Sequence, residues 1–279
     1  MLIIAESGST KTNWLTENKE LFETIGFNPL FFSSEDIYHE LLKHDQLHAA
    51  RKQFTKIFFY GASCSSDERN QIISVAMKKF FDNAKVIQVD HDLKAAALAT
   101  YDGRPGVACI LGTGSNSCLY DGKEVSEEVP ALGYVLGDEG SGAYFGKKLL
   151  AKFLYHELPE ETTKLLRDDY GLEKEKIFDA VYKKPHANVY LASFAKALTD
   201  STDKEFMQKF AEEGFTDFFS HHVCCYKNYQ NYPVHFVGSI AFHFRNELQK
   251  VADKFGCELG VVDKNPVYRL LDWHLKNNQ

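Results

Sequence analysis

Two stretches of this sequence follow the same plan, LIIAESGSTKTNWLTENKEL at residues 2–21 and VACILGTGSNSCLYDGKEV at residues 107–125. Each begins with an apolar run, passes through a turn of small residues, resumes with a second short strand pattern and ends in a charged turn. Their small-residue turns lie about 104 residues apart. An internal repeat of this kind predicts two similar halves, each opening with a hairpin of two strands.

The segments around these stretches alternate between strand and helix patterns. This alternation favours an α/β fold with a mainly parallel sheet. Apolar runs predict strands over 56–60, 86–89 and 232–237. Helical spacing of apolar residues predicts helices over 35–54, 67–81, 93–100, 140–154, 189–198, 204–226, 240–255 and 266–276.

The composition excludes several classes of protein. The chain has 279 residues, 44% of them hydrophobic, and a formal net charge of -7, which argues against nucleic acid as a partner. No apolar run reaches the roughly 20 residues that a membrane span needs. The apolar run at residues 2–5 is too short for a signal peptide, so we expect a cytoplasmic protein. The six cysteines form no CxxC pair, which favours reduced thiols.

The two small-residue turns are candidates for binding phosphate. In Glu6–Thr12 (ESGSTKT), small residues let backbone N–H groups approach an anion, and Lys11 adds a positive charge. Gly112–Asn116 (GTGSN) offers the same chemistry without the lysine. Neither turn has the glycine and lysine spacing of a P-loop. Two such turns that face each other could hold a polyphosphate from both sides.

Acidic residues follow the predicted strand at 86–89. Asp90 and Asp92 stand at its carboxyl end, where functional groups of open α/β sheets gather. A carboxylate there could accept the proton of a hydroxyl group, and either residue could be that base. The alternative for Asp92 is capping of the helix that follows, since Asp is favoured at that position.

Two further segments have both a structural and a functional interpretation. Gly137–Ser141 (GDEGS), with Gly133 upstream, either caps the next helix or allows close approach of a ligand to the backbone. His221–Cys225 (HHVCC) has residue types that bind metal. Neighbouring helical side chains diverge, however, so a solvated or buried helix face is the favoured interpretation.

Taken in order, these segments resemble the actin/hexokinase/Hsp70-like superfamily. More closely, they resemble the family that joins N-acetylglucosamine kinase with the ATPase subunits of benzoyl-CoA reductase. The resemblance rests on ESGSTKT, Asp92, GTGSN, Gly133 with GDEGS, and GSI at 238–240. It implies two ribonuclease H-like (actin-like ATPase) domains with an ATP cleft between them. The first would span 1–106 and be completed by a C-terminal helix at 266–279, and the second would span 107–265.

The resemblance also implies roles for individual residues. Asp92 would be the catalytic base, and Glu6 would hold Mg²⁺ through water, although many members have Asp at this position. Leu132 stands where sugar kinases of the family tend to have Trp. The cofactor ATP would be bound by Gly8, Ser9, Thr10, Lys11, Thr12, Gly112, Thr113, Gly114, Ser115, Gly238, Ser239 and His243. The sugar would be bound by Asn28, Asp92, Asn116, Gly133 and Asp138.

The function that this resemblance implies is ATP-dependent phosphorylation of an amino sugar, with N-acetylglucosamine and its 6-hydroxyl as the expected substrate. The expected assembly is a homodimer. Three alternatives stay open at this point: a kinase of glucosamine or N-acetylmuramic acid, an ATPase that activates an iron–sulfur dehydratase or reductase, and a sugar sensor without catalysis.

Overall fold

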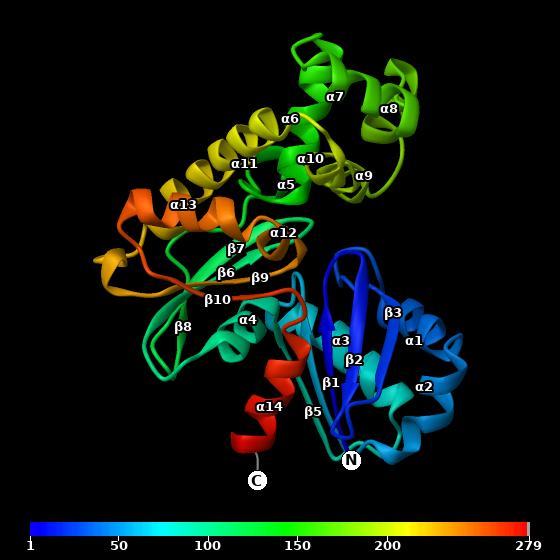
Figure 1. The fold of residues 1–279 in the computed structure, drawn as a ribbon. Helices are drawn as coiled ribbons and strands as arrows, with labels where there is room; N and C mark the ends of the chain where they lie inside the picture. The colour runs from blue at the N-terminus through cyan, green and yellow to red at the C-terminus, as the bar shows by residue number, and fades with distance from the viewer. Residues whose placement is uncertain (278–279) are drawn as a thin grey trace. The chain divides into compact units, whose positions relative to one another are not determined.

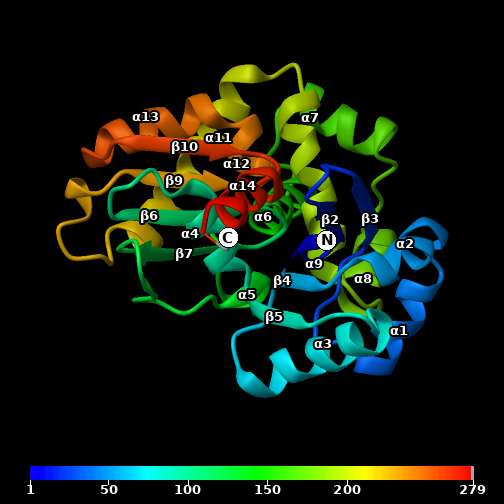
Figure 2. The ribbon, with the colours of Figure 1, turned by 90° about the horizontal axis from the view of Figure 1, so that it is seen from below.

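The computed structural model describes residues 1–277. They divide into two compact units, one of Met1–Tyr101 together with the chain from Asn265 onward, and the other of Asp102–Lys264. Each unit contains one five-stranded sheet flanked by helices (Figures 1 and 2). The prediction of an α/β fold is therefore confirmed.

The first unit has the strand order β3-β2-β1-β4-β5. β1 pairs antiparallel with β2 and parallel with β4, and β5 continues the parallel side. The strands are β1 (Leu2–Ser7), β2 (Lys11–Thr16), β3 (Leu21–Ile25), β4 (Lys56–Gly61) and β5 (Val86–His91). The helices are α1 (Ser34–Leu42), α2 (Asp45–Ala50), the 3₁₀ turn η1 (Arg51–Gln53), α3 (Asp67–Phe80), α4 (Asp92–Thr100) and α14 (Val267–Asn277).

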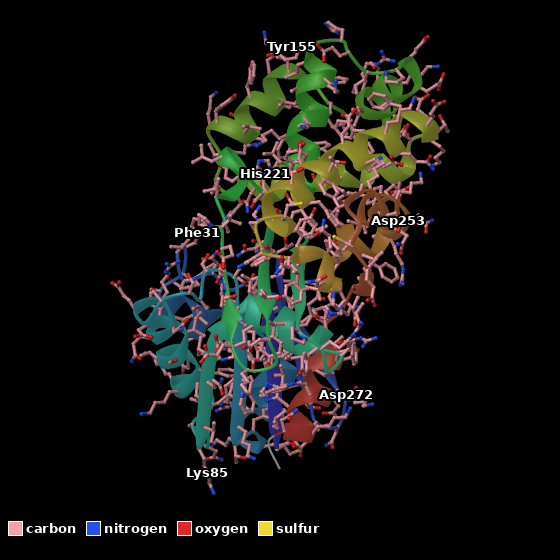
Figure 3. All side chains as sticks on the ribbon, turned by 90° about the vertical axis from the view of Figure 1, so that its left-hand side faces the viewer. Phe31, Lys85, Tyr155, His221, Asp253 and Asp272 are labelled. Atoms are coloured by element: carbon pink, nitrogen blue, oxygen red, sulfur yellow. The ribbon has the colours of Figure 1, made fainter. Side chains whose placement is uncertain are left out.

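The strands β1 and β4 at the centre of this first sheet are buried on both faces, which explains why their sequences are nearly continuous apolar runs. Alternate side chains such as Ile3 and Phe59 pack in one core with residues of α1 and α3. α14 packs against α4 and buries Leu270, Leu271 and His274, while Asp272 points away from this buried face (Figure 3). The last two residues of the predicted helix at 266–279 lie outside the described residues.

The second unit has the strand order β10-β9-β6-β7-β8. β6 pairs antiparallel with β7 and parallel with β9, which repeats the arrangement around β1. The strands are β6 (Gly106–Leu111), β7 (Ser115–Tyr120), β8 (Val125–Ser126), β9 (Val234–Val237) and β10 (Leu259–Asp263). The predicted boundary after residue 106 falls at the start of β6, whereas the chain passes from one unit to the other after Tyr101.

Most helices of the second unit lie between β8 and β9. They are α5 (Gly133–Leu136), α6 (Gly142–Leu154), α7 (Glu160–Lys164), η2 (Leu165–Asp169), α8 (Lys174–Tyr182), α9 (Ala187–Ser193), η3 (Phe194–Lys196), α10 (Ala197–Asp200), α11 (Lys204–Phe218), η4 (Phe219–Val223) and η5 (Tyr229–Asn231). α12 (Ser239–His243) and α13 (Arg245–Phe255) follow β9.

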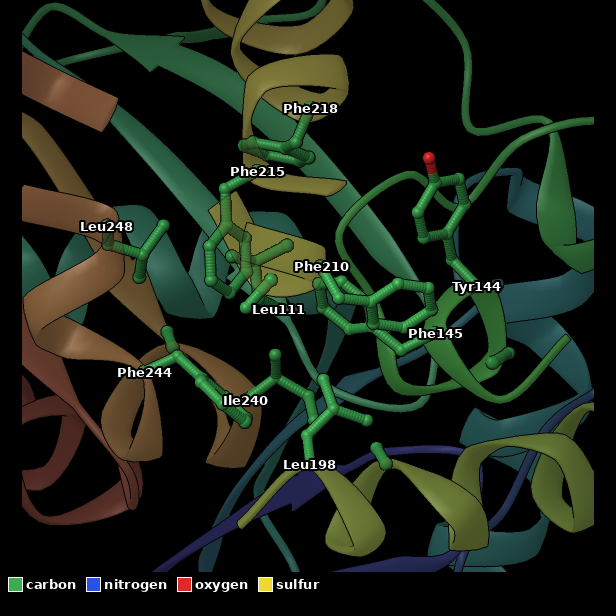
Figure 4. Close-up of a cluster of buried hydrophobic side chains, with 14 of the residues drawn as sticks. Leu111, Tyr144, Phe145, Leu198, Phe210, Phe215, Phe218, Ile240, Phe244 and Leu248 are labelled. Carbon is green, nitrogen blue, oxygen red and sulfur yellow. The ribbon is translucent and has the colours of Figure 1, made fainter. Parts of the chain in front are cut away.

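Aromatic side chains dominate the core of the second unit (Figure 4). The ring of Phe145 on α6 meets that of Phe215 on α11 edge to face, with centroids 5.4 Å apart. Phe244 packs against both rings. Because such pairs stabilise beyond their buried area, they fix how α6, α11 and α13 pack together.

The structure differs from the predicted elements at several helices and strands, and the helix predicted over 189–198 divides into α9, η3 and α10. The helix predicted over 35–54 breaks at Lys43, and the His44 Nδ1 atom caps the second piece by accepting from the Leu47 N–H. The helix over 240–255 breaks at Phe244, and the helix over 204–226 changes to a π-helical turn at Phe219. β3 and β10 were not predicted, because β3 is an edge strand with exposed side chains and the pairing of β10 shifts register.

No helix among residues 1–277 combines the length and the apolar character that crossing a membrane requires.

Candidate active site

The first small-residue turn joins β1 to β2, as the sequence predicts. Its backbone closes with the Gly8 N–H donating to the Lys11 carbonyl at 3.0 Å. Ser9 and Thr10 are exposed at the tip. Beside the turn, the Gly26 N–H donates to the Thr10 carbonyl at 3.1 Å, and a Cβ atom on Gly26 would lie 2.2 Å from the Gly8 oxygen. The absence of a side chain at Gly26 is therefore what lets the chain after β3 support the turn.

The hydroxyl groups that flank this turn point inward. Ser7 and Thr12 are fully buried, and their oxygens lie 2.8 Å apart. The Thr12 hydroxyl also donates to the Ile25 carbonyl, and the Phe27 N–H donates to the Ser7 hydroxyl. The side chain of Thr12, a predicted ATP contact, is thus used inside the hairpin and is not presented to a ligand.

Lys11 carries the only positive charge of the turn, and it forms an ion pair that the sequence did not suggest. Its Nζ atom lies 2.6 Å from Glu23 Oε2 on the neighbouring strand β3, with about half of each side chain exposed. An exposed pair of this kind is weak, so Lys11 remains able to turn towards an anion.

Glu6 and Asp92 form an acidic pair at the carboxyl edge of the first sheet. The register aligns Glu6 with Tyr60 and Tyr60 with Asp90, so β1, β4 and β5 end together. Burial raises the pKa of Glu6, and the charge of Asp92 raises it further against an opposing hydrogen bond from Asn13. The Asn13 amide donates to Glu6 Oε2 at 3.3 Å.

The two candidate bases, Asp90 and Asp92, have different hydrogen-bond and ion-pair partners in the structure. Asp90 accepts from the Lys94 ammonium at 2.6 Å and from the His91 backbone N–H at 2.9 Å. Asp92 begins α4, and its carboxylate lies 3.0 Å from His91 Nε2. Burial raises the pKa of Asp92, with His91 and the Leu93 N–H acting in the opposite direction. The N-cap position of α4 belongs to His91, so capping by position does not explain Asp92.

Asn28 follows Gly26 and Phe27 on the segment that supports the first turn. Its side-chain oxygen accepts from the Leu30 N–H at 2.9 Å, and the residue is partly exposed. This bond fixes the orientation of the amide group, as in an Asx-turn.

The second small-residue turn joins β6 to β7 and has a different support. The carbonyls of Gly112 and Thr113 accept the N–H groups of Gly142 and Ala143 at 2.8 and 3.0 Å. The first turn of α6 therefore holds this turn through the backbone. A Cβ atom on Gly112 would meet no atom within 4 Å, so the backbone at Gly112 is open to a close contact.

Asp138 of the GDEGS segment lies against this second turn. Its Oδ1 atom accepts from the Ser115 N–H at 3.4 Å, and a Cβ atom on Gly114 would lie 3.0 Å from its carboxylate. Burial, with the nearby charge of Glu139, raises the pKa of Asp138 to about 6. The left-handed backbone of Asp138, with φ of 61°, turns its side chain towards Ser115. GTGSN and GDEGS, 20 residues apart in sequence, thus form one cluster.

The other predicted residues of the second unit lie in three settings. Asn116 is buried on β7, where its side-chain oxygen accepts from the Ser117 N–H. The Ser115 hydroxyl is buried and has no hydrogen-bond partner among the described residues. Gly133, with φ of 71°, begins the exposed helix α5. Neither Ser115 nor Asn116 offers its side chain to solvent in this structure.

Gly238 brings the end of β9 beside the second turn. It has φ of 115°, and a Cβ atom on it would lie 2.4 Å from the Leu111 oxygen, so this position requires glycine. Ser239 is partly exposed, and His243 is exposed with its Nε2 atom 3.4 Å from Lys264 Nζ.

Glu139 and His222 form a buried contact that the sequence analysis did not identify. The carboxylate of Glu139 lies 3.4 Å from His222 Nε2, with 18% and 6% of the two side chains exposed. The signal available in the sequence was the motif itself, GDEGS, in which only Asp138 received a role.

The HHVCC segment shows no metal site. No group of three or more His, Cys, Asp or Glu side chains within residues 1–277 could hold a metal ion. His222 is buried in the core and His221 is exposed with its Nδ1 atom 2.8 Å from the Asp217 carbonyl. The favoured interpretation as a helix face is consistent with this arrangement.

Comparisons with known proteins identify a strong relative among solved structures. No protein-family model matches the chain, and no curated protein sequence matches it. A candidate N-acetylglucosamine kinase from Porphyromonas gingivalis is 35% identical, covers 100% of both chains and has a TM-score of 0.93.

Two more distant structures share the fold. A candidate N-acetylglucosamine kinase from Chromobacterium violaceum is 17% identical over 98% of both chains, with a TM-score of 0.57. A ROK family glucokinase from Streptomyces griseus, solved in complex with glucose and AMPPNP, is 12% identical over 96% of this chain and 97% of that chain, with a TM-score of 0.54.

Full-length identity of 35% to the first of these proteins, on a matching two-unit fold, decides the family. The chain belongs to the family that joins N-acetylglucosamine kinase with the ATPase subunits of benzoyl-CoA reductase, within the actin/hexokinase/Hsp70-like superfamily.

Proposed function

We propose that this protein is an ATP-dependent sugar kinase, and that its substrate is N-acetylglucosamine, phosphorylated at the 6-hydroxyl. The observation that carries the proposal is the 35% identity over the whole chain to a candidate N-acetylglucosamine kinase. The two units would be the two actin-like ATPase domains, and each would supply one phosphate-binding turn.

The nucleotide would be bound by backbone groups at these two turns. In the first unit, Ser9 and Thr10 are exposed at the tip and Lys11 lies beside them. In the second unit, Gly112 leaves its backbone open, and Ser239 and His243 at the end of β9 would lie near the adenosine. We assign to Gly8, Thr12, Gly114, Ser115 and Gly238 contacts or support through the backbone, because their side chains are absent or turned inward. Thr113, which is partly exposed, would also contact ATP.

Mg²⁺ fits the acidic pair of the first unit. Mg²⁺ prefers carboxylate oxygens and water, together with substrate phosphates, and needs only one or two protein carboxylates. Glu6 and Asp92 are partly buried, and they lie close enough for the charge of Asp92 to raise the pKa of Glu6, so a divalent cation would relieve this repulsion. We assign Glu6 as the residue that holds the metal through water.

We assign Asp92 as the base. When bound, ATP with Mg²⁺ supplies the phosphoryl group and the neutralisation of its charge. Asp92 would orient the sugar hydroxyl and accept its proton, which leaves the oxygen able to attack in line. Its raised pKa makes the carboxylate a better proton acceptor. Asp90 is the weaker candidate because Lys94 and the His91 N–H already occupy its oxygens.

The sugar would contact Asn28 and Asp92 of the first unit and Gly133 and Asp138 of the second. Asn116, which is buried here, would have to expose its side chain to make the contact expected of it. Asn28 and Asp138 are both partly exposed and have fixed orientations, which suits recognition of hydroxyl groups. Leu132, where sugar kinases of the family tend to carry Trp, is 53% exposed beside Gly133. This difference would tune which amino sugar is preferred.

The test is ATP consumption with a panel of sugars: N-acetylglucosamine, glucosamine, N-acetylmuramic acid, N-acetylmannosamine and glucose. We expect the highest kcat/KM with N-acetylglucosamine and a 6-phosphate product by ³¹P NMR. Asp92→Asn should lower kcat by ~10²–10⁴, whereas Asp90→Asn, the matched control, should stay within about fivefold. A protein that consumes ATP equally with and without every sugar contradicts the proposal.

The cysteines give little support to the alternative of an ATPase that activates an iron–sulfur enzyme. Cys64, Cys109, Cys118 and Cys257 are buried, and only the adjacent Cys224 and Cys225 are partly exposed. Ligands for a cluster shared with a second subunit would have to reach the surface. A brown protein that absorbs near 400 nm after anaerobic reconstitution with iron and sulfide would favour this alternative over the kinase.

A further inference from the structure

The sugar-binding role proposed for Asp138 requires its carboxylate to be held in place, although Asp138 lies on an irregular segment. Gly137 and Gly140 flank Asp138 and Glu139, and Asp138 itself adopts a left-handed backbone. Such a segment needs support from outside, because its own backbone is permissive. The support is visible in the contact between Glu139 and His222.

The loop Gly137–Gly140 curves around the carboxylate of Glu139. A Cβ atom on Gly137 would lie 3.3 Å from Glu139 Oε2 and 2.9 Å from the Leu132 Cβ. The carboxylate therefore occupies the inside of the bend, and a group that fixes it also fixes the backbone on both sides. His222 is that group, since its Nε2 atom lies 3.4 Å from Glu139 Oε2.

Two contacts hold His222 in place. Its ring stacks on Phe218, with centroids 4.9 Å apart and an interplanar angle of 17°. Its backbone carbonyl accepts from the Ser117 hydroxyl at 2.6 Å. It belongs to the π-helical turn η4, a rare geometry that often occurs at functional sites.

These contacts link Asn116 and Asp138, two of the sugar-binding candidates of the second unit. Ser117 follows Asn116 on β7, and Ser117 binds the backbone of His222. His222 contacts Glu139, which follows Asp138, and Asp138 accepts from the N–H of Ser115. The chain of contacts thus begins and ends on β7, next to Asn116.

The charge state of His222 suits this role. Burial lowers the pKa of its imidazole, against the opposing effect of Glu139. A neutral ring that donates from Nε2 leaves Nδ1 as an acceptor, and this buried Nδ1 atom has no partner among the described residues. A buried polar atom without a partner costs free energy, and an aromatic side chain that lacks the Nδ1 atom, such as phenylalanine, would avoid that cost.

We propose that His222 is a positioning residue for sugar recognition: through Glu139 it sets the orientation in which Asp138 meets the substrate. This proposal rests on the function proposed above. His222 itself would touch neither the sugar nor the nucleotide.

The test compares His222→Phe with His222→Gln. Phenylalanine keeps the stacking on Phe218 but removes the donor, whereas glutamine places an N–H donor near the position of Nε2. His221→Phe is the control on the same turn, where His221 is exposed (Figure 3). We expect His222→Phe to raise the KM for the sugar about tenfold, with the KM for ATP within about twofold, because the contact of His222 Nε2 with the Glu139 carboxylate is lost. His222→Gln and His221→Phe should both stay within about threefold of the parent protein.

A second readout separates this inference from the kinase proposal. The carboxyl carbon of Asp138, followed by ¹³C NMR during a pH titration, should move towards the ordinary Asp pKa in His222→Phe and remain raised in His222→Gln. This measurement needs no substrate. If no sugar is phosphorylated by the parent protein, the kinase proposal fails and the titration alone decides the role of His222.

Two outcomes would overturn the inference. The first is a His222→Phe protein with a lower melting temperature or kcat but an unchanged KM for the sugar, which would give His222 only a structural role. The second is an Asp138 titration that is the same in the parent protein and in His222→Phe.

Discussion

The turn after β1 and the turn after β6 have similar sequences and different surroundings. Both follow the first strand of a sheet, and both lead into an antiparallel partner. The first has an exposed tip and is supported by the chain at Gly26. The second is partly buried, and its carbonyls accept from the first N–H groups of α6.

This comparison teaches that the hairpin is a local property, while the rigidity of its turn depends on what packs beside it. A turn with solvent-exposed backbone opens at low free energy, whereas a turn bound to a helix is held by the stability of that helix. We therefore expect the first turn to adjust when a nucleotide binds and the second to be formed beforehand.

The largest expected effect is on kcat, and it distinguishes Asp92 of the first unit from Asp138 of the second. Asp92→Asn should lower kcat by ~10²–10⁴, and its effect on the dissociation constant of the sugar should be no larger than about tenfold. Asp138→Asn should instead raise the sugar dissociation constant about tenfold, because an ionised acceptor is replaced by a neutral amide. Calorimetry and steady-state kinetics on both variants check this division. An equal loss of kcat in the two would remove it.

The next effect concerns the glycines that support the turns. Gly26→Ala and Gly238→Ala place a Cβ atom 2.2 and 2.4 Å from a backbone oxygen, and Gly238 also has a positive φ. Each should lower the free energy of unfolding by about 2 kcal/mol or more. Gly8→Ala and Gly112→Ala, which meet no atom closer than 3.9 Å, are the matched controls and should cost less than about 1 kcal/mol.

Thermal unfolding followed by circular dichroism measures these four variants. If Gly26→Ala is as stable as Gly8→Ala, the first turn does not depend on the chain after β3.

A smaller effect is expected in the pH dependence of the KM for the sugar and of the free energy of unfolding. The pKa of Asp138 is raised to about 6, so its carboxyl gains a proton as the pH falls through that value. The KM for the sugar should rise below pH 6, and Asp138→Asn should abolish this dependence. The effect on stability has the opposite sign, because a raised carboxyl pKa means that folding favours the protonated form. Asp138 should therefore add to stability as the pH falls from about 6 to about 4.

Steady-state kinetics between pH 5 and 8 measure the KM for the sugar, and denaturant unfolding over the same range measures the free energy of unfolding. A KM that is constant across this range would exclude Asp138 as an ionised sugar contact.

The smallest expected effects are those on stability and on the KM for ATP, and they test the role of Lys11, which has no counterpart in the second turn. Glu23→Ala breaks an exposed ion pair and should change stability by less than about 0.5 kcal/mol. Lys11→Met should raise the KM for ATP several-fold, and Glu23→Ala should lower it slightly by freeing the lysine. A KM for ATP that is unaffected by Lys11→Met would show that this turn binds through its backbone alone.

Much of this fold is predictable because its signals are local. The apolar runs at β1, β4 and β6 and the helical spacing in α3 and α6 identify those elements from neighbouring residues alone. The misses have local causes as well. β3 is an exposed edge strand, and the helix predicted over 240–255 breaks at Phe244, where no proline or glycine announces the break.

The candidate site is predictable in its motifs but not in its partners. ESGSTKT, GTGSN and GDEGS are visible in the sequence as small or acidic clusters. That Thr12 turns inward, that Glu23 pairs with Lys11 and that His222 meets Glu139 depends on segments between 10 and about 80 residues away. No pattern in a single sequence reports such pairs.

By itself, the sequence determined the repeated hairpin plan, the α/β class and the positions of the small-residue turns. Strand and helix periodicity and the demand for small side chains in tight turns act over a few residues, and so they can be read along the chain. Only the tertiary structure decided which hydroxyl groups are buried, which partners Asp90 and Asp92 have, and what holds Asp138. Burial and electrostatic interactions depend on distances through space, which the fold alone sets.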